Sequence, residues 1–173
     1  ANEVPEVCDI LIENEPEVIP IQIKCRGTAN TSDISKAETW ATNKLKKDSK
    51  KIVGAIKSCE SRDVHVNNQT RGQLTFRSGT ISPICGIVLV EYDGASMRLD
   101  SGLPSRSRSG VPIHYFSVND FKFLCTYLMT FSDLLRYLQS RATLEATKFN
   151  YLNREKDFAA LYRMSGELFD QGA

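Results

Sequence analysis

Two short segments near the amino end alternate between apolar and polar residues, which is the pattern of half-buried β-strands. Residues 6–13 (EVCDILIE) and 18–25 (VIPIQIKC) are rich in β-branched side chains. The residues between them, Asn14-Glu15-Pro16-Glu17, are typical of a tight turn. The pattern therefore predicts an antiparallel hairpin, with one apolar face packed against a core.

The turn also predicts which residues of the hairpin lie opposite each other. If it is centred between Glu15 and Pro16, the numbers of paired residues sum to 31, so Asp9 lies opposite Gln22. Lys24 lies two residues along the strand from Gln22 and therefore on the same face. One face of the hairpin would then carry a carboxylate, an amide and an ammonium group close together. The simpler explanation is a polar cluster on the protein surface with no further role.

The rest of the chain shows first helical, then strand-like, then again helical patterns. Apolar residues recur at helical spacing over 36–58, and Ile84 to Tyr92 is a nearly continuous apolar run, as expected of a strand covered on both faces. A capping-box pattern at Ser117–Asp120 predicts the start of a helix. Further expected elements are short strands over 63–66 and 73–77, a mobile Ser-rich loop over 100–110, a helix capped by Ser132, and a last helix over 156–169.

These elements predict an α/β fold with a mixed central sheet, flanking helices and a helical carboxyl-terminal part. The length of 173 residues suits one domain, which we divide into an α/β core over 1–116 and a helical segment over 117–173 that packs on that core. The first residue is Ala1 rather than Met, which indicates either processing or truncation of the amino end, and the sequence alone does not decide between them.

Composition and charge narrow the class of protein. Apolar residues make up 41% and charged residues 25%, which is typical of a globular chain. With 22 basic and 21 acidic residues the formal net charge is +1, so any binding of nucleic acid must depend on a local basic patch. No apolar run is long enough to span a bilayer. The five widely spaced cysteines favour reduced thiols in a core, and with them a cytoplasmic location.

Asp9 in CDILIE, followed by Gln22-Ile23-Lys24 in IPIQIKCR, resembles the active-site pattern of the PD-(D/E)xK, or restriction-endonuclease-like, nuclease superfamily. The match is to its Gln-x-Lys variant, which is familiar from Mrr-type restriction endonucleases. The resemblance covers mainly residues 6–58 and implies a restriction-endonuclease-like core over 1–116. Two features depart from the usual pattern. Gln replaces the more common Glu, and only eight residues precede Asp9, where a helix usually stands.

The resemblance implies a role for each residue of the hairpin. Asp9, the Gln22 side-chain oxygen and the Ile23 carbonyl would bind Mg²⁺ or Mn²⁺, and Lys24 would orient the water or stabilise the transition state. Phosphodiester hydrolysis needs these parts: a hard cation held by oxygens, an activated water and a nearby positive charge. Because Gln22 lacks the charge of a Glu, we expect weak metal binding that depends on the substrate phosphate.

Two groups of basic residues are candidates for binding nucleic acid. The first is the polar face of the expected helix, where the simpler explanation is a solvated surface, and the second is the Ser-rich loop, where the simpler explanation is a disordered insertion. These candidates are Lys44, Lys47, Lys50, Lys51, Arg106 and Arg108.

The sequence thus predicts a divalent-metal-dependent endonuclease that acts on DNA in a restriction or defence-like setting. The alternative is a catalytically inactive nuclease-like module that binds nucleic acid or a partner protein. Cleavage of a duplex would favour a homodimer, because two strands need two sites. The chain could equally be one module of a longer protein with further domains.

Overall fold

The computed structural model of the protein describes residues 7–25, 34–68, 70–92, 97–98, 102–128, 130–143 and 151–152. Its centre is a mixed sheet in the order β1-β2-β6-β8, with the short β5 also paired to β2. The strands of this sheet are β1 (Ile10–Asn14), β2 (Glu17–Lys24), β5 (Ser82–Pro83), β6 (Gly86–Val90) and β8 (Ile113–Ser117). β1 is antiparallel to β2, whereas β2, β6 and β8 are parallel.

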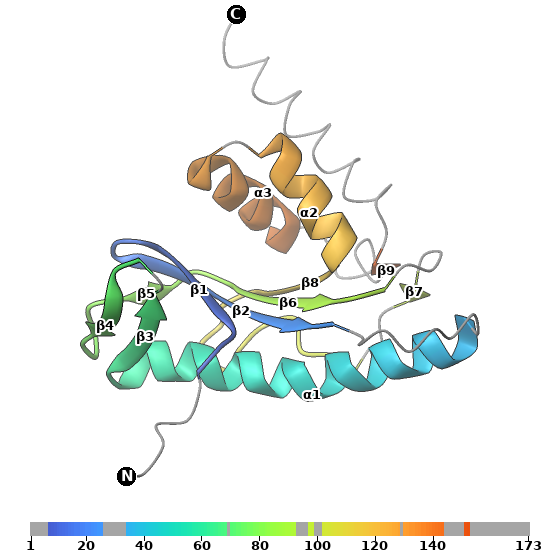
Figure 1. Ribbon diagram of the computed structural model, residues 1–173, viewed down its shortest axis with the longest axis horizontal. Coiled ribbons are helices and arrows are strands. Elements are labelled where there is room, and N and C mark those ends of the chain that lie inside the picture. Colours follow the sequence, from blue (N-terminus) through green and yellow to red (C-terminus); the bar gives the residue numbers. More distant parts are fainter. Residues whose placement is uncertain are drawn as a thin grey trace, which may run out of the picture.

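Helices cover both faces of the sheet, so the protein is an α/β fold with three layers (Figure 1). The long helix α1 (Ile34–Ser61) lies on one face, and α2 (Val118–Tyr127) and α3 (Phe131–Thr143) lie on the other (Figure 1). α1 forms most of the long connection that leads from β2 to its parallel neighbour β6, as a crossover between parallel strands requires. Among the described residues, none of the helices has the length and apolarity needed to cross a membrane.

The hairpin has the predicted register. The paired residues from Ile10 with Ile21 to Asn14 with Glu17 have numbers that sum to 31, as the position of the turn predicted. Alternation along β2 sends Ile19 and Ile21 into the core beneath α2 and α3. Gln22 lies on the opposite face of the strand, toward α1. β2 is therefore buried on both of its faces, whereas Ile10 on the edge strand β1 is 46% exposed.

The predicted run at 84–92 is the central strand β6, buried at every position between β2 and β8. Its first residue lets α1 approach closely, because a Cβ at Gly86 would lie 2.8 Å from Cγ1 of Ile52. Two separate two-stranded sheets complete the described structure: β3 (Val64–Asn68) pairs with β4 (Gly72–Phe76) as a hairpin, and β7 (Met97–Arg98) pairs with the distant β9 (Tyr151–Leu152). The strands expected at 63–66 and 73–77 thus form their own sheet.

Several expectations about the second half differ from the structure. The strand β8 was not predicted, because its five residues follow a loop and lead directly into a helix. The loop before it is not simply a mobile segment: the backbone N–H groups of Ser107 and Ile113 donate to the carbonyls of Val111 and Ser105, at 2.8 and 2.9 Å. The helix expected over 156–169 lies outside the described residues.

The helix caps follow local chemistry. The N–H of Asp120 donates to Ser117 Oγ at 2.9 Å, which confirms that α2 begins where the capping-box pattern predicted, with Ser117 as its N-cap. α3 is capped by Thr130 rather than by Ser132: the N–H of Asp133 donates to Thr130 Oγ1, and the N–H and hydroxyl of Thr130 both donate to Oδ2 of Asp133. The cap is reciprocal and begins the helix two residues earlier than expected.

The five cysteines, all within the described residues, form no disulfide. Cys59 and Cys85 are buried, and burial raises the pKa of their thiols to about 11 and about 12. Cys25 and Cys125 are exposed, contrary to the expectation that the cysteines lie mainly in the core.

A buried arginine links α3 to β8. The guanidinium of Arg141 donates to the carbonyl of Tyr115 at 3.2 Å, lies 4.1 Å from the ring centroid of Phe116, and approaches His114 Nδ1 at 3.5 Å. Burial lowers the pKa of His114 well below 6.5, and the charges of Arg141 and Arg106 lower it further. His114 is therefore neutral in the folded protein at neutral pH.

We expect His114 to make the protein sensitive to mild acid. Below pH 6.5 the unfolded chain binds a proton at this residue that the folded protein does not, so stability is present above that pH and is lost as the pH falls. In His114→Leu the slope of unfolding free energy between pH 7 and pH 5 should be shallower, by up to about 1.4 kcal/mol per pH unit. Urea unfolding at several pH values measures this slope. Parallel curves for wild type and variant would contradict the prediction.

Candidate functional site

Asp9 is held at the end of the first strand by two hydrogen bonds to β2. The paired ladder stops at Ile10, and Asp9 bends away from it, so Asp9 is not a ladder partner of Gln22 as the extrapolated register predicted. Its backbone N–H donates to the carbonyl of Ile21 at 3.1 Å, and its Oδ2 accepts from the N–H of Ile23 at 2.6 Å. A carboxylate thus occupies the place that a backbone carbonyl of a longer β1 would take.

Lys24 and Asp9 do come together. Lys24 Nζ lies 4.0 Å from Oδ2 of Asp9, and the two side chains are 29% and 28% exposed. Because a partly exposed ion pair of this kind contributes little to stability, the fold does not depend on it. The result is a carboxylate and an ammonium group at one point, both open to solvent.

The carbonyl of Ile23 faces the same region. The N–H of Glu91 donates to the carbonyl of Lys24 at 2.8 Å, so the peptide groups of Lys24 are directed toward β6. Because the peptide groups of successive residues in a strand point to opposite sides, those of Ile23 are directed toward β1. Its N–H meets Asp9 there, and its carbonyl oxygen lies on the same side of the strand.

Gln22 is placed differently from Asp9. Its residue is only 3% exposed, and it lines a cavity of about 420 Å³ together with residues of α1 that include Lys51, Ala55 and Ser58. Asp9 does not line this cavity. The amide of Gln22 therefore lies between the sheet and the helix, on the inner side of the exposed pair.

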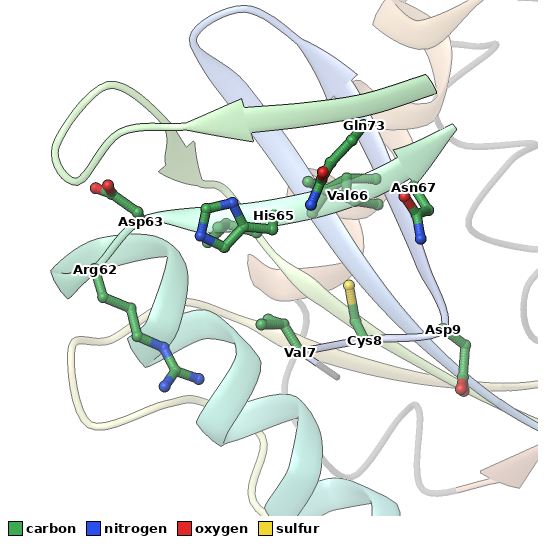
Figure 2. A pocket seen from close by; sticks show the side chains of 11 residues that line it. Val7, Cys8, Asp9, Arg62, Asp63, His65, Val66, Asn67 and Gln73 are labelled. Carbon is green, nitrogen blue, oxygen red and sulfur yellow. The ribbon is translucent and has the colours of Figure 1, made fainter. Parts of the chain in front are cut away.

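A second cavity, of about 540 Å³, lies between residues 7–9 and the β3–β4 hairpin (Figure 2). The hairpin and the end of α1 contribute polar side chains to its wall, and the Asp9 side chain points away from those of His65 and Gln73 (Figure 2). Val7 and Arg62 line both cavities. The segment that carries Asp9 is therefore flanked by hollows on two sides.

Asp48 is the residue that the sequence interpretation missed. It lies on α1, is only 1% exposed, and neither of its carboxylate oxygens has a hydrogen-bond partner among the described residues. Burial raises the pKa of its carboxyl group. The nearby charge of Asp9 raises it too, whereas Lys24, Lys51 and Lys44 lower it. Asp48 is thus close enough to the exposed pair to interact with both of its members.

One signal in the sequence could have identified Asp48. It falls on the same helical stripe as the buried residues Leu45, Ile52 and Ala55, at spacings of three and four residues. An aspartate at a core position of an amphipathic helix is unusual, because a buried charge needs a partner. The surrounding lysines in KLKKDSKK hide this signal in a run of charged residues.

The candidate lysines of α1 separate into two groups. Lys44 and Lys51 are near Asp48, and Lys51 also lines the cavity next to Gln22. Lys47 and Lys50 are exposed and line neither of the two cavities. Only the first group is close to the residues that the resemblance singles out.

The structure does not bring the loop arginines to this region. Arg106 is bridged to Pro112, just before β8, where Ile113 is level with Gly86 of β6. Lys24 is level with Val90, four residues further along β6 and thus about 13 Å away along the strand direction. Arg106 also donates to the carbonyl of Gly110 at 2.7 Å, within its own loop, and Arg108 belongs to the same loop.

Oxygen donors in this region suit a hard divalent cation. Among the described residues no three His, Cys, Asp or Glu side chains gather as a metal-binding cluster. Mg²⁺, however, is bound in many enzymes by one or two carboxylates and completes its shell with water and substrate phosphate. The Asp9 carboxylate and the Ile23 carbonyl fit that requirement.

Comparisons of the chain with protein-family models, with curated proteins and with solved structures find no match.

Proposed function

We propose that the protein is a divalent-metal-dependent nuclease with a restriction-endonuclease-like core, and that it hydrolyses phosphodiester bonds of DNA. The observation that carries the proposal is the meeting of Asp9 and Lys24 at 4.0 Å, with the Asp9 carboxylate on the N–H of Ile23. A carboxylate, a strand carbonyl and an ammonium group at one solvent-open point are what metal-assisted hydrolysis of a phosphodiester needs.

Each residue has a separate task in this proposal. Asp9 and the carbonyl of Ile23 hold Mg²⁺ or Mn²⁺, and Gln22 supports them from the inner side. When bound, the metal ion polarises the phosphate and lowers the pKa of a water. Lys24 donates hydrogen bonds to the attacking water or to the phosphate oxygens as negative charge develops. In the reaction the water oxygen bonds to phosphorus, one phosphorus–oxygen bond to a sugar breaks, and the leaving oxygen takes up a proton.

The surroundings of the pair supply positive charge for a nucleic-acid backbone. Lys44 and Lys51 on α1 lie near Asp48, beside Lys24, and Arg62 lies between the two cavities. Because the formal net charge of the chain is only +1, the salt dependence of binding should reflect these few residues rather than a field around the whole molecule. Lys47, Lys50, Arg106 and Arg108 are not needed for this contact.

The proposal predicts DNA cleavage that depends on a divalent cation. Plasmid DNA and a labelled single strand are incubated with the purified protein and about 5–10 mM Mg²⁺ or Mn²⁺, because a weak metal site needs a large excess of the ion to be occupied. Cleavage should appear with either ion and stop on addition of EDTA, and Ca²⁺ should not replace them in full, because it prefers larger and more flexible oxygen shells. Gel electrophoresis measures the products.

Folded protein that cleaves neither substrate with either ion would contradict the proposed function. Salt-dependent binding of DNA without cleavage would then favour the module that only binds nucleic acid. Cleavage that persists in EDTA would exclude the metal-dependent mechanism.

A further inference from the structure

The buried carboxylate of Asp48 lacks the contacts that normally hold such a group. It lies in the layer between α1 and the sheet, where Leu45 and Ile52 of the same helix are fully or almost fully buried. Neither of its oxygens accepts a hydrogen bond from the described part of the chain. An ionised carboxylate that is removed from water without hydrogen bonds is costly, and native proteins rarely retain one without compensation.

Nearby lysines give only part of that compensation. Lys24, Lys51 and Lys44 attract the Asp48 charge, but burial is the larger effect and leaves the pKa of the carboxyl group raised. A purely structural ion pair would instead show direct hydrogen bonds between the partners, because these make a buried pair tolerable. The position of Asp48 therefore lacks a sufficient structural explanation within the described residues.

The Asp48 carboxylate lies near the part of the hairpin where Gln22 stands in place of a charged Glu. Asp48 is buried on α1, one turn before Lys51, which lines the cavity next to Gln22, and Lys24, two residues along β2 from Gln22, lies 4.0 Å from Asp9. The charges of both Lys24 and Asp9 act on the Asp48 carboxyl group. Gln22, at the position where Glu is more common in the resembling family, carries no charge. A divalent cation between two carboxylates would satisfy both oxygens of Asp48 and relieve the repulsion between Asp48 and Asp9.

We infer that Asp48 is a carboxylate ligand of a divalent cation, which it shares with Asp9, and that it supplies from helix α1 the charge that Gln22 cannot. This inference rests on the proposed function for the use of the metal, but not for its binding. The site would take Mg²⁺ or Mn²⁺, with the Ile23 carbonyl and waters as further oxygen ligands.

Binding of Mn²⁺ alone, without nucleic acid, tests the inference. Mn²⁺ is titrated into the protein and followed by calorimetry and by the loss of its free electron-spin-resonance signal. Wild type should bind one ion, and Asp48→Asn should bind it at least tenfold more weakly. Asp120→Asn is the matched control, because Asp120 is also a buried aspartate but belongs to α2 on the other face of the sheet. Its affinity for Mn²⁺ should equal that of wild type.

Thermal unfolding in EDTA shows whether the variant is folded. Since neither oxygen of the buried Asp48 carboxylate has a hydrogen-bond partner among the described residues, its charge is costly in the metal-free fold, and Asp48→Asn should melt at the same temperature as wild type or higher. If that variant does not fold, Asp48→Ser, which is smaller and also uncharged, takes its place.

The outcomes separate this inference from the proposed function. Equal Mn²⁺ affinity of wild type and folded Asp48→Asn would overturn the role of Asp48, even if DNA is cleaved. A wild-type protein that binds no Mn²⁺ would overturn it as well. Mn²⁺ binding that is weakened in Asp48→Asn, in a protein that cleaves no DNA, would support the metal site and contradict only the nuclease activity.

Discussion

Replacing Lys24 by alanine should lower the rate of metal-dependent DNA cleavage by about 10²–10³-fold, the loss observed when one preorganised donor to a developing charge is removed. Among the described residues, the ammonium group that pairs with the Asp9 carboxylate is that of Lys24, at 4.0 Å, and the Lys24 side chain is 29% exposed. The fold should be retained, since a partly exposed ion pair contributes at most about 1 kcal/mol. Single-turnover cleavage of a labelled duplex measures the rate.

Lys122→Ala serves as the control for this loss. Lys122 is exposed on α2, on the face of the sheet opposite α1, and removal of its charge should leave the rate unchanged. The affinity of Lys24→Ala for Mn²⁺ should be no weaker than that of wild type, because the variant removes a positive charge beside the metal site. Cleavage at the wild-type rate by Lys24→Ala would rule out the proposed role of this residue.

The second large effect is expected from Asp9→Asn. This substitution removes the charge of a proposed metal ligand but keeps a side-chain oxygen that can accept the N–H of Ile23, which now donates to Oδ2 at 2.6 Å. Loss of a residue that only supports a metal ligand through a hydrogen bond lowers metal affinity by up to about 10²-fold. We expect the loss of the ligand Asp9 itself to lower Mn²⁺ affinity by at least as much, and to abolish cleavage. Calorimetric titration and the cleavage assay report the two effects separately.

A carboxylate on β1 itself provides the comparison. Glu13 is paired with Val18 near the turn, four residues from Asp9, and Glu13→Gln removes an equal charge from the hairpin. This variant should bind Mn²⁺ and cleave DNA as wild type does. Should Asp9→Asn keep its metal and its activity, the hairpin carboxylate would have no part in the site.

Local patterns in the sequence were sufficient for several elements. The register of β1 and β2 follows from alternation and from the position of the turn, and it holds from Ile10 to Asn14. The cap at Ser117 depends on residues three apart, and the central strand β6 on a continuous apolar run. In each case the determining interactions lie within a few residues of one another.

The candidate site was predictable only in part. The resemblance singled out Asp9 and Lys24, which the structure brings to 4.0 Å of each other. It gave Gln22 an equal place, but packing against α1 buries that residue on the inner side, away from the cavity that Asp9 lines. Asp48 was absent from the prediction. The helical stripe marks it as a buried aspartate, but no local pattern shows which part of a 28-residue helix lies next to the end of β2.

The sequence by itself therefore determined the hairpin, the long helix, the central strand and the one-face placement of Gln22 and Lys24, because side-chain alternation and helical periodicity are properties of the chain alone. Only the tertiary structure decided that Asp48 is buried close enough to Lys24 and Asp9 for their charges to act on it, and that Arg106 lies at the other end of the sheet. These placements depend on the strand order and on the packing of α1 across β2 and β6, in which residues distant along the chain are brought together by the burial of apolar surface.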